Sequence, residues 1–456
     1  IVIIKKKTKS QAYFFFLLLE ITNKNKPMKR RDFIQKTAAS ASVFSIVPSH
    51  VLGFSGTAPN DKVQLGFIGV GKQGRGLMKN FVNYEGAAVM AVSDVDRLKM
   101  NFFSETFQES MKKEGKATYA LDEISSYRDL LARKDIDAVV IASPDHWHAQ
   151  MAVDAAKAGK DIYCEKPLSS SVAEGRAMVD AARKYDRVFQ TGSMQRSWDR
   201  FRHGVNLIRN GYIGTITSIN VAIGAPYKAC DLPSQEIPEN IDWEAWIGPA
   251  PYRGYHFDLA CPIEDKRWGM WRDYTPFGGG MITDWGAHMF DIVQWALDMD
   301  HTGPLQFNPP GGVATEGLTY TYENGITVTH TKWGKGNNEI QFIGTEGSLE
   351  ISRSYLKTFP NAALADTPLK DSDTQRVYNS PNHHLDWLDA IKNRTRPICD
   401  VEVGHRTASV CNVANIAYAL QRPLEWNPQS EQFIDDLGAN LMLDRAYRGH
   451  WDYRDF

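Results

Sequence analysis

The turn Gly69-Val70-Gly71-Lys72-Gln73-Gly74 lies between two segments of different periodicity. Residues 63–68, before the turn, form a short apolar run that is typical of a buried parallel strand. Residues 77–82, after it, repeat apolar side chains at the spacing of one helix face. Strand, glycine turn and helix in this order are the context that the pattern G-x-G-x-x-G requires, and they predict a dinucleotide site.

The three glycines of the turn have separate roles. Gly69 permits the tight turn, Gly71 lets a pyrophosphate approach the backbone, and Gly74 lets the helix pack close to the strand. The helix N-terminus presents free N–H groups and a partial positive charge to the phosphates. We therefore expect these glycines and the neighbouring Gln73 to contact the cofactor.

Asp94 ends the next apolar run, residues 87–93. An acidic residue at this distance from the glycines accepts hydrogen bonds from a ribose 2′-OH, and its charge repels a 2′-phosphate. The pairing predicts NAD as the cofactor rather than NADP. The alternative is a glycine loop in an unrelated α/β protein, with Asp94 capping a helix.

Apolar strands alternate with helices from residue 61 to residue 192, which predicts a doubly wound parallel sheet. Ligands of such sheets bind outside the carboxyl ends of the strands. The further cofactor contacts expected at these ends are Ser143, Pro144, His146, His148, Glu165, Lys166 and Gln195.

Lys166 follows one of these strands. A lysine in a cleft beside the nicotinamide can hydrogen-bond a substrate hydroxyl and ease proton transfer. A surface ion pair with Glu165 is the open alternative. His146 and His148 lie at a helix start, where either one faces the nicotinamide or both serve capping and packing.

After Gln195 the sequence changes character. Short strand patterns and the hairpin signal Asn324-Gly325 predict a large, mostly antiparallel sheet with helices on one face. Many of the twelve tryptophans lie between residues 195 and 335. Tryptophans stack on sugar rings but more often pack in a core, so we expect one or two to face the ligand.

Asp284 and His288 are four residues apart in a predicted helix, on one face. A carboxylate and an imidazole placed together suit general acid–base chemistry near neutral pH. The alternative is that Asp284 caps the helix and His288 is a core residue bonded to it.

The N-terminal region predicts export. A basic segment with Arg30-Arg31 and an alanine-rich apolar run follow Met28, and together they resemble a twin-arginine (Tat) signal. We interpret residues 1–27 as an upstream extension and residues 28–57 as the signal region of a periplasmic protein that the Tat machinery exports. A basic helix on a cytoplasmic protein is the alternative.

Composition excludes few other classes. The net charge of −2 gives no reason to expect nucleic acid as a partner. No apolar stretch is long enough to span a bilayer, so stable membrane insertion is not expected. The five cysteines are scattered without a zinc pattern, and no metal site is predicted.

From Lys62 to the C-terminus the chain resembles the glucose–fructose oxidoreductase / inositol dehydrogenase / rhizopine catabolism (Gfo/Idh/MocA) family, and most closely its Tat-exported members. The combination of motifs is more specific than any one of them. The matching pieces are residues 69–74, Ser143-Pro144, Glu165-Lys166-Pro167, Gly279-Gly280, Asp284 with His288, residues 344–347, Arg396-Pro397 and residues 403–406.

The resemblance implies a Rossmann domain over residues 58–193, an α/β substrate and oligomerisation domain with an open-faced sheet over residues 194–380, and C-terminal helices over residues 381–456 that pack back on the body. It also implies a homodimer or homotetramer formed through that sheet.

The resemblance further implies a catalytic trio of Lys166, Asp284 and His288. In this scheme Lys166 orients the alcohol and His288 shuttles its proton. Asp284 either orients the histidine or contacts a neighbouring hydroxyl.

These features predict an NAD-dependent enzyme that oxidises a secondary alcohol of a sugar or glycoside. The first alternative is redox-neutral glycoside cleavage by transient oxidation and elimination, with a resident, tightly bound NAD. It is motivated by export, since little free NAD is available outside the cytoplasm. The alternative of another class is a non-catalytic dinucleotide or sugar sensor.

Overall fold

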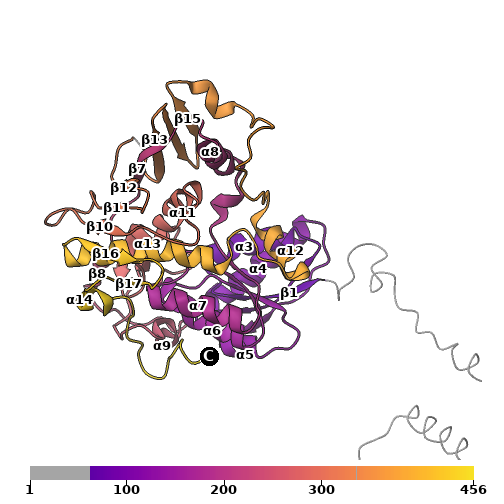
Figure 1. Ribbon diagram of the computed structural model, residues 1–456. Coiled ribbons are helices and arrows are strands. Elements are labelled where there is room, and N and C mark those ends of the chain that lie inside the picture. Colours follow the sequence, from indigo (N-terminus) through magenta and orange to yellow (C-terminus); the bar gives the residue numbers. More distant parts are fainter. Residues whose placement is uncertain (1–61, 335) are drawn as a thin grey trace, which may run out of the picture. The chain divides into compact units, whose positions relative to one another are not determined.

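The computed structural model describes residues 62–334 and 336–456 (Figure 1). The twin-arginine segment lies outside the described residues, so export stays a prediction. Within the described ranges, no helix combines the length and hydropathy needed to cross a bilayer.

The first sheet has six strands in the order β3-β2-β1-β4-β5-β6, and every pair is parallel. Its strands are β1 (Val63–Ile68), β2 (Ala87–Ser93), β3 (Asp122–Ile124), β4 (Ala138–Ile141), β5 (Asp161–Cys164) and β6 (Phe189–Thr191). Its helices are α3 (Lys72–Val82), α4 (Arg97–Lys113), α5 (Tyr127–Leu131), α6 (His148–Lys157) and α7 (Val172–Lys184). The strand order reverses between β1 and β4, beside the glycine turn. The predicted doubly wound sheet is confirmed.

The second sheet has nine strands in the order β15-β14-β13-β7-β12-β11-β10-β16-β17, and only the β7–β12 pair is parallel. Its strands are β7 (Ile216–Ala222), β10 (Gln306–Asn308), β11 (Thr319–Thr321), β12 (Thr327–His330), β13 (Glu339–Gly344), β14 (Ser348–Ser352), β15 (Leu356–Phe359), β16 (Leu424–Asn427) and β17 (Gln432–Phe433). The predicted mostly antiparallel sheet is confirmed.

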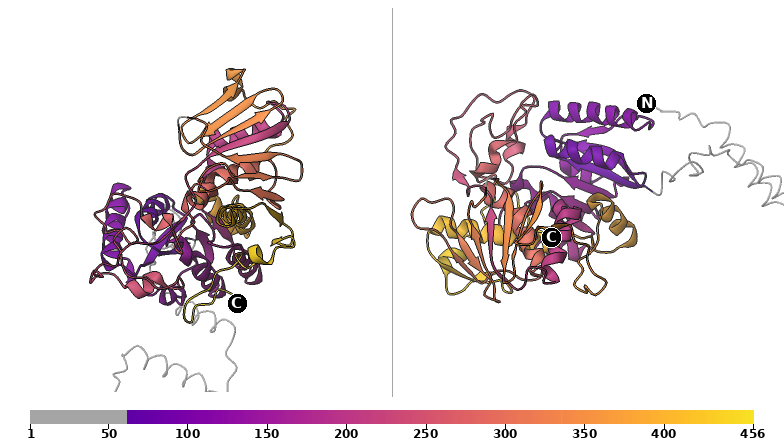
Figure 2. Two further views of the ribbon diagram at one scale, coloured as in Figure 1. Left: turned by 90° about the vertical axis from the view of Figure 1, so that its left-hand side faces the viewer. Right: turned by 90° about the horizontal axis from the view of Figure 1, so that it is seen from above.

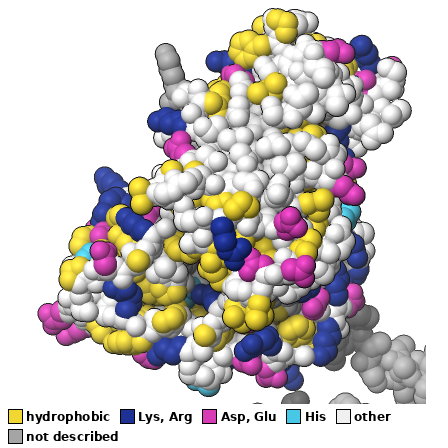
Figure 3. Space-filling model, turned by 60° about the vertical axis from the view of Figure 1, so that its left-hand side comes forward, with side chains coloured by type: hydrophobic (Ala, Val, Ile, Leu, Met, Phe, Trp, Pro, Cys, Tyr) yellow, Lys and Arg dark blue, Asp and Glu magenta, His cyan; other side chains and the backbone are white. Residues whose placement is uncertain are grey.

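Helices cover one face of this second sheet (Figure 1, Figure 2). They are α8 (Asp199–Arg209), α11 (Gly286–Ala296) and α13 (Val401–Leu420), which pack with the inward side chains of the strands in one core. Ile219 and Val221 of β7 point into this core, whereas Ser218 and Asn220 alternate with them on the other face. That other face is largely polar and uncharged in the space-filling view (Figure 3).

The segment from residue 381 belongs to both domains. The helix α12 (His383–Asn393) places Trp387 in the same buried cluster as Phe67 and Phe81 of the first domain. The strands β16 and β17 then extend the second sheet, and α14 (Leu437–Asn440) follows. We expected helices only in this segment, because strands of four and two residues carry too little periodicity to be recognised.

The predicted helix that carries Asp284 is broken. One turn, α10 (Gly280–Asp284), ends where α11 begins, with Trp285 between them. A Cβ on Gly286 would lie 3.2 Å from Cys411 Sγ, so the glycine lets α11 approach α13 closely. The N-cap residue of α11 is Trp285, and the expected alternative in which Asp284 caps this helix is wrong.

The region between β7 and α10 contains little regular structure. Its elements are β8 (Lys228–Ala229), α9 (Trp243–Ile247), the 3-10 turn η4 (Met270–Asp273) and β9 (Tyr274–Thr275). Its aromatic side chains, among them Trp243, Trp246 and Trp271, form a separate small core. This region, which we call the aromatic insertion (residues 225–279), contributes to the site described next. The remaining short 3-10 turns are η2 (Asp145–Trp147), η3 (Met194–Ser197) and η5 (Ala362–Asp366).

Candidate active site

The glycine turn leaves space only where a phosphate would approach. Gly69 has a φ of +80°, and a Cβ there would lie 2.5 Å from the backbone nitrogen of Ser143. A Cβ on Gly74 would lie 2.4 Å from the carbonyl oxygen of Gly69. A Cβ on Gly71 would meet no atom within 4 Å, and this residue lines a cavity. The turn therefore fits a pyrophosphate placed against Gly71 at the start of α3.

Asp94 holds this turn in place. Its carboxylate accepts the N–H of Val70 at 2.8 Å and the N–H of Asp96 at 3.0 Å. Burial raises the pKa of Asp94, although the charge of Lys99 and both N–H groups act in the opposite direction. The helix cap of α4 is Asp96, so the alternative in which Asp94 serves as a cap is wrong.

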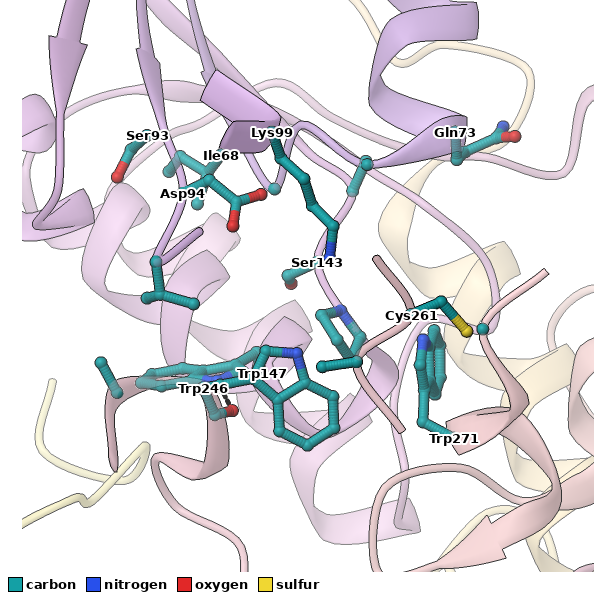
Figure 4. Close-up of a pocket in the computed structure, with 18 of the residues that line it drawn as sticks. Ile68, Gln73, Ser93, Asp94, Lys99, Ser143, Trp147, Trp246, Cys261 and Trp271 are labelled. Atoms are coloured by element: carbon teal, nitrogen blue, oxygen red, sulfur yellow. Dashed lines mark hydrogen bonds between the residues drawn. The ribbon is translucent and has the colours of Figure 1, made fainter. Parts of the chain in front are cut away.

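A cavity of about 430 Å³ lies at the carboxyl ends of β1, β2 and β4 (Figure 4). Six predicted cofactor contacts line it, namely Gly69, Gly71, Gln73, Asp94, Ser143 and Pro144. In Figure 4 the indoles of Trp147 and Trp246 lie on the opposite side of the cavity from Asp94. The buried hydroxyl of Ser143 has no hydrogen-bond partner in the structure.

The aromatic insertion contributes the outer wall of this cavity. Trp246, Cys261, Trp268 and Trp271 all line it. The Lys72 ammonium, within the glycine turn, donates to the carbonyl oxygens of Lys266 and, at 3.2 Å, Arg267. More tryptophans than the expected one or two therefore face the cavity, because the insertion folds over the glycine turn.

His146 and His148 do not line the cavity. The ring nitrogens of His148 lie 2.8 Å from the carbonyl oxygen of Pro167 and 3.1 Å from that of Ser143. His146 Nε2 lies 3.0 Å from the carbonyl oxygen of Trp246. Burial lowers the pKa of His146 to about 3 and that of His148 to about 4. Both rings are therefore buried against loop carbonyl oxygens, outside the lining of this cavity.

Lys166 follows β5 and crosses to the second domain. Its ammonium donates to Asp284 Oδ1 at 2.6 Å and to the Asp284 carbonyl oxygen at 3.1 Å. Its backbone N–H donates to Glu165, which in turn accepts a bond from the Gln73 amide at 2.7 Å. The charge partner of Lys166 is thus Asp284, not Glu165, and the glycine turn is linked to the lysine through one carboxylate.

Arg272 of the aromatic insertion lies 3.5 Å from the same Asp284 oxygen. Burial would raise the pKa of Asp284, but the charges of Lys166 and Arg272 outweigh it, and the pKa is lowered. Asp284 is therefore an anion between two cations. No sequence signal identified Arg272 beforehand, because it lies in a region without regular periodicity.

His288 is buried, and its Nδ1 has no hydrogen-bond partner. Burial, helped by the charges of Lys166 and Arg353, lowers the pKa of His288 well below its usual value. Among the described residues no hydrogen bond joins His288 to Asp284, although their spacing predicted one helix face. The Asp284 carboxylate accepts its hydrogen bond from Lys166 instead.

Gln195 and Arg353 connect this histidine to the second sheet. Gln195 is buried, and its amide donates to the His288 carbonyl oxygen at 3.5 Å and accepts a bond from Arg353 at 2.8 Å. The Arg353 guanidinium lies 4.5 Å from the centre of the Trp285 ring. Arg353 follows β14, where nothing in the sequence distinguishes it from a surface residue.

Two family models match the chain. The model described as "Oxidoreductase family, NAD-binding Rossmann fold" covers residues 63–193. The model described as "Oxidoreductase family, C-terminal alpha/beta domain" covers residues 214–453.

Known proteins resemble the chain to different extents. An uncharacterised oxidoreductase, YrbE, from Bacillus subtilis is 26% identical over 80% of this chain and 96% of its own length. A glycosyl hydrolase family 109 protein from Shewanella pealeana is 32% identical over 40% of this chain, and the match spans 38% of that protein.

Solved structures share the fold. A myo-inositol dehydrogenase from Lactobacillus casei, crystallised with NAD(H) and myo-inositol, superposes with a TM-score of 0.52 at 18% identity. The superposition covers 84% of this chain and all of that one. With both family models matched in order along the chain, the protein belongs to the Gfo/Idh/MocA oxidoreductase family.

Proposed function

We propose that this protein is an NAD-dependent oxidoreductase that acts on a secondary alcohol of a sugar or glycoside. One observation carries the proposal: Lys166, at a strand end, is held at 2.6 Å by Asp284 of the other domain, with the partnerless His288 one helical turn further on. Several other buried histidines also have an unpartnered ring nitrogen, so the proposal rests on the Lys166–Asp284 pair together with His288 and not on His288 alone.

The residues of the cavity fit a nicotinamide dinucleotide. The open space at Gly71 suits the pyrophosphate, and the unpartnered Ser143 hydroxyl offers a further hydrogen bond. When bound, the nicotinamide ring supplies the acceptor for a hydride from the alcohol carbon.

The chain's own residues then handle the alcohol and its proton. The Lys166 ammonium donates a hydrogen bond to the substrate oxygen and stabilises the negative charge that develops there. The neutral His288 imidazole accepts the hydroxyl proton, since its lowered pKa keeps it unprotonated before the reaction. Asp284 positions Lys166 through the bond between them.

NAD is favoured over NADP by the place of Asp94 on the cavity wall. Replacing Asp94 by alanine should weaken NAD binding far more than NADP binding, because hydrogen bonds to charged groups contribute roughly 1.5–3 kcal/mol. Equal weakening of both cofactors would contradict the preference, and titration of each cofactor on emptied protein measures it.

Redox-neutral glycoside cleavage is the second candidate. It is favoured by the insertion that covers the glycine turn through Lys72, and by the similarity to a glycosyl hydrolase family 109 protein. In this scheme the ketone formed on the sugar acidifies the neighbouring C–H. That proton leaves to a base, the glycosidic substituent is eliminated with its electron pair, water adds to the resulting double bond, and the hydride returns to the carbonyl carbon.

Product analysis separates the two candidates. A keto sugar formed with stoichiometric NADH supports net oxidation, whereas a cleaved glycoside without net NADH supports the redox-neutral route. Absence of turnover on any glycoside, with dinucleotide bound, would favour the sensor alternative. The redox-neutral route also requires a tightly held cofactor, so native mass spectrometry of protein purified without added NAD should detect bound dinucleotide.

Export and assembly belong to this proposal as well. A resident cofactor suits a protein exported already folded, as the residues Arg30-Arg31 predict. A homodimer or homotetramer formed through the uncovered sheet face remains our expectation, and the native mass spectrum reports the subunit count directly.

A further inference from the structure

The C-terminal tail, residues 444–456, runs back across the first domain and reaches the dinucleotide cavity. Trp451, five residues before the end of the sequence, lines that cavity together with residues that follow β2 and β3. No motif of the sequence marked this tail as part of the site.

Two arginines hold the tail in place. The Arg445 guanidinium donates to Glu174 of α7 at 2.6 Å and to the carbonyl oxygen of His146 at 2.7 Å. Glu174 is 1% exposed, so the pair is a buried one. Arg448 donates to the carbonyl oxygen of Gly248 at 3.0 Å and forms an ion pair with Glu244 of α9. The tail is thus fixed both to the Rossmann helices and to the aromatic insertion.

Trp451 itself joins two other residues of the cavity wall. The Arg128 guanidinium lies 4.5 Å from the centre of its ring, and the Trp147 ring meets it edge-on at 4.9 Å. Arg128 is also paired with Asp154 of α6 at 3.1 Å. Arg128 and Trp147 line the same cavity, so the three side chains form one continuous piece of its wall.

This piece of wall lies at one end of the cavity. Arg128 follows β3, the strand beside β2, and β2 ends at Asp94. In a Rossmann fold the acidic residue after β2 binds the adenosine ribose. The side chains on the β3 side of Asp94 therefore belong to the adenosine half of the site, away from Lys166 after β5.

We propose that the C-terminal tail is part of the cofactor site, and that Trp451 and Arg128 form the wall against which the adenine base binds. The inference rests on the proposed binding of a dinucleotide. It assigns retention of the cofactor to a segment far from the glycine turn in sequence, which Arg445 and Arg448 anchor to the body.

The test compares Trp451→Ala with Tyr453→Phe, which removes one tail hydrogen bond, to Asp444, without touching the cavity wall. NADH dissociation is followed by nicotinamide fluorescence after a chase, and binding of ADP-ribose and of nicotinamide mononucleotide is titrated on emptied protein. Loss of one contact with a base should speed NADH release and weaken ADP-ribose binding about tenfold. Nicotinamide mononucleotide binding should not change, and Tyr453→Phe should match the wild type in all three measurements.

Equal weakening of ADP-ribose and nicotinamide mononucleotide would overturn the proposal, because it would indicate a general loss of structure. So would unchanged NADH release in Trp451→Ala. Trp451→Phe keeps an aromatic wall and should restore most of the lost affinity, which guards against a variant that folds poorly. If the wild type binds neither NAD nor NADP, the proposed function itself fails, a result distinct from failure of the tail alone.

Discussion

The turns at residues 144–148 and 284–288 share several residue types but differ in the hydrogen bonding of their histidines. The first contains a buried aspartate, a tryptophan and two histidines, and the second contains a partly buried aspartate, a tryptophan and one histidine. In the first turn His148 has a backbone carbonyl oxygen against each ring nitrogen. In the second, His288 Nδ1 has no partner. His146 Nδ1 of the first turn also has no partner, so the contrast in hydrogen bonding is one between His148 and His288.

The aspartates of the two turns, Asp145 and Asp284, differ in the direction of their pKa shifts. Burial raises the pKa of Asp145 well above its usual value, and the nearby charge of Arg272 only partly opposes this. The pKa of Asp284 is lowered because Lys166 and Arg272 outweigh its burial. Two carboxyl groups with pKa values pushed apart are a common arrangement in sites that move protons. The comparison assigns the charged role to the second turn and a supporting role to the first.

The strongest test of this comparison is His288→Ala. If His288 accepts the substrate proton, turnover should fall about 10²–10⁴-fold, the usual contribution of a general base. Dinucleotide binding should stay close to the wild type. The loss of stability should be limited to the packing of the ring, including its contact with Trp285, since no hydrogen bond of the ring is lost. Turnover is measured on protein with a verified dinucleotide content. Unchanged turnover on the true substrate would remove the proposed proton transfer.

Asp284→Asn should have the next largest effect. The substitution keeps the shape of the side chain but removes the charge that holds Lys166 at 2.6 Å, and we expect about a 100-fold loss of turnover, or roughly 2.7 kcal/mol of transition-state stabilisation. Turnover is again measured on protein with a verified dinucleotide content. Turnover within a few-fold of the wild type would contradict the positioning role of Asp284.

The parts of the site also differ in how far the sequence alone could predict them. The positions of the glycine turn and of Asp94 in the fold were predictable because the order of strand, turn and helix fixes the local backbone geometry. The pair of Lys166 and Asp284 was reached only through family resemblance, since the two residues are 118 positions apart. Arg272, Arg353 and Trp451 carry no local pattern. Their positions depend on how the aromatic insertion, the second sheet and the tail pack against the first domain.

The helix break at Trp285 marks the limit of periodicity as a guide. Residues 281–297 have a continuous apolar pattern, and four-residue spacing predicted that Asp284 and His288 share a face. The apolar pattern indicates that the segment is buried on all sides. One long helix and two short helices are equally compatible with such burial. Just after the break, a Cβ on Gly286 would lie 3.2 Å from Cys411 Sγ, a contact that local periodicity does not reveal. A sequence pattern that reports burial therefore does not by itself predict a hydrogen bond between two polar side chains.

His148→Ala should show the reverse of His288→Ala. The neutral ring has one N–H, so the substitution removes its hydrogen bond to one of the two carbonyl oxygens, of Pro167 or Ser143, in a buried place, which should lower the free energy of unfolding by about 1–3 kcal/mol. Turnover per folded molecule should change only a few-fold. Urea unfolding and active-site-normalised kinetics measure the two effects separately. A loss of turnover as large as that of His288→Ala, with stability unchanged, would place His148 among the reacting groups and reverse the comparison.

The last test is the pH dependence of stability. The change in unfolding free energy with pH reports directly whether His148 is buried and neutral in the folded protein. The pKa of His148 is lowered to about 4 in the folded protein, against about 6.5 in the unfolded chain. A folded pKa below the unfolded one means that the unfolded chain binds the proton more readily. The stability that His148 contributes is therefore present above pH 6.5 and is lost as the pH falls towards 4.

For this one ring the loss at pH 5 is roughly 2 kcal/mol relative to pH 7. Other groups titrate in the same range, so the quantity to measure is a difference of differences: the change in unfolding free energy between pH 7 and pH 5 for the wild type, minus that for His148→Gln. Glutamine does not titrate, and its amide can still donate to a carbonyl oxygen. The wild type should lose about 2 kcal/mol more than the variant. Equal losses would mean that the pKa of His148 is the same in the folded and unfolded states. The ring would then behave like that of an exposed histidine, and its assignment as a buried supporting residue would be wrong.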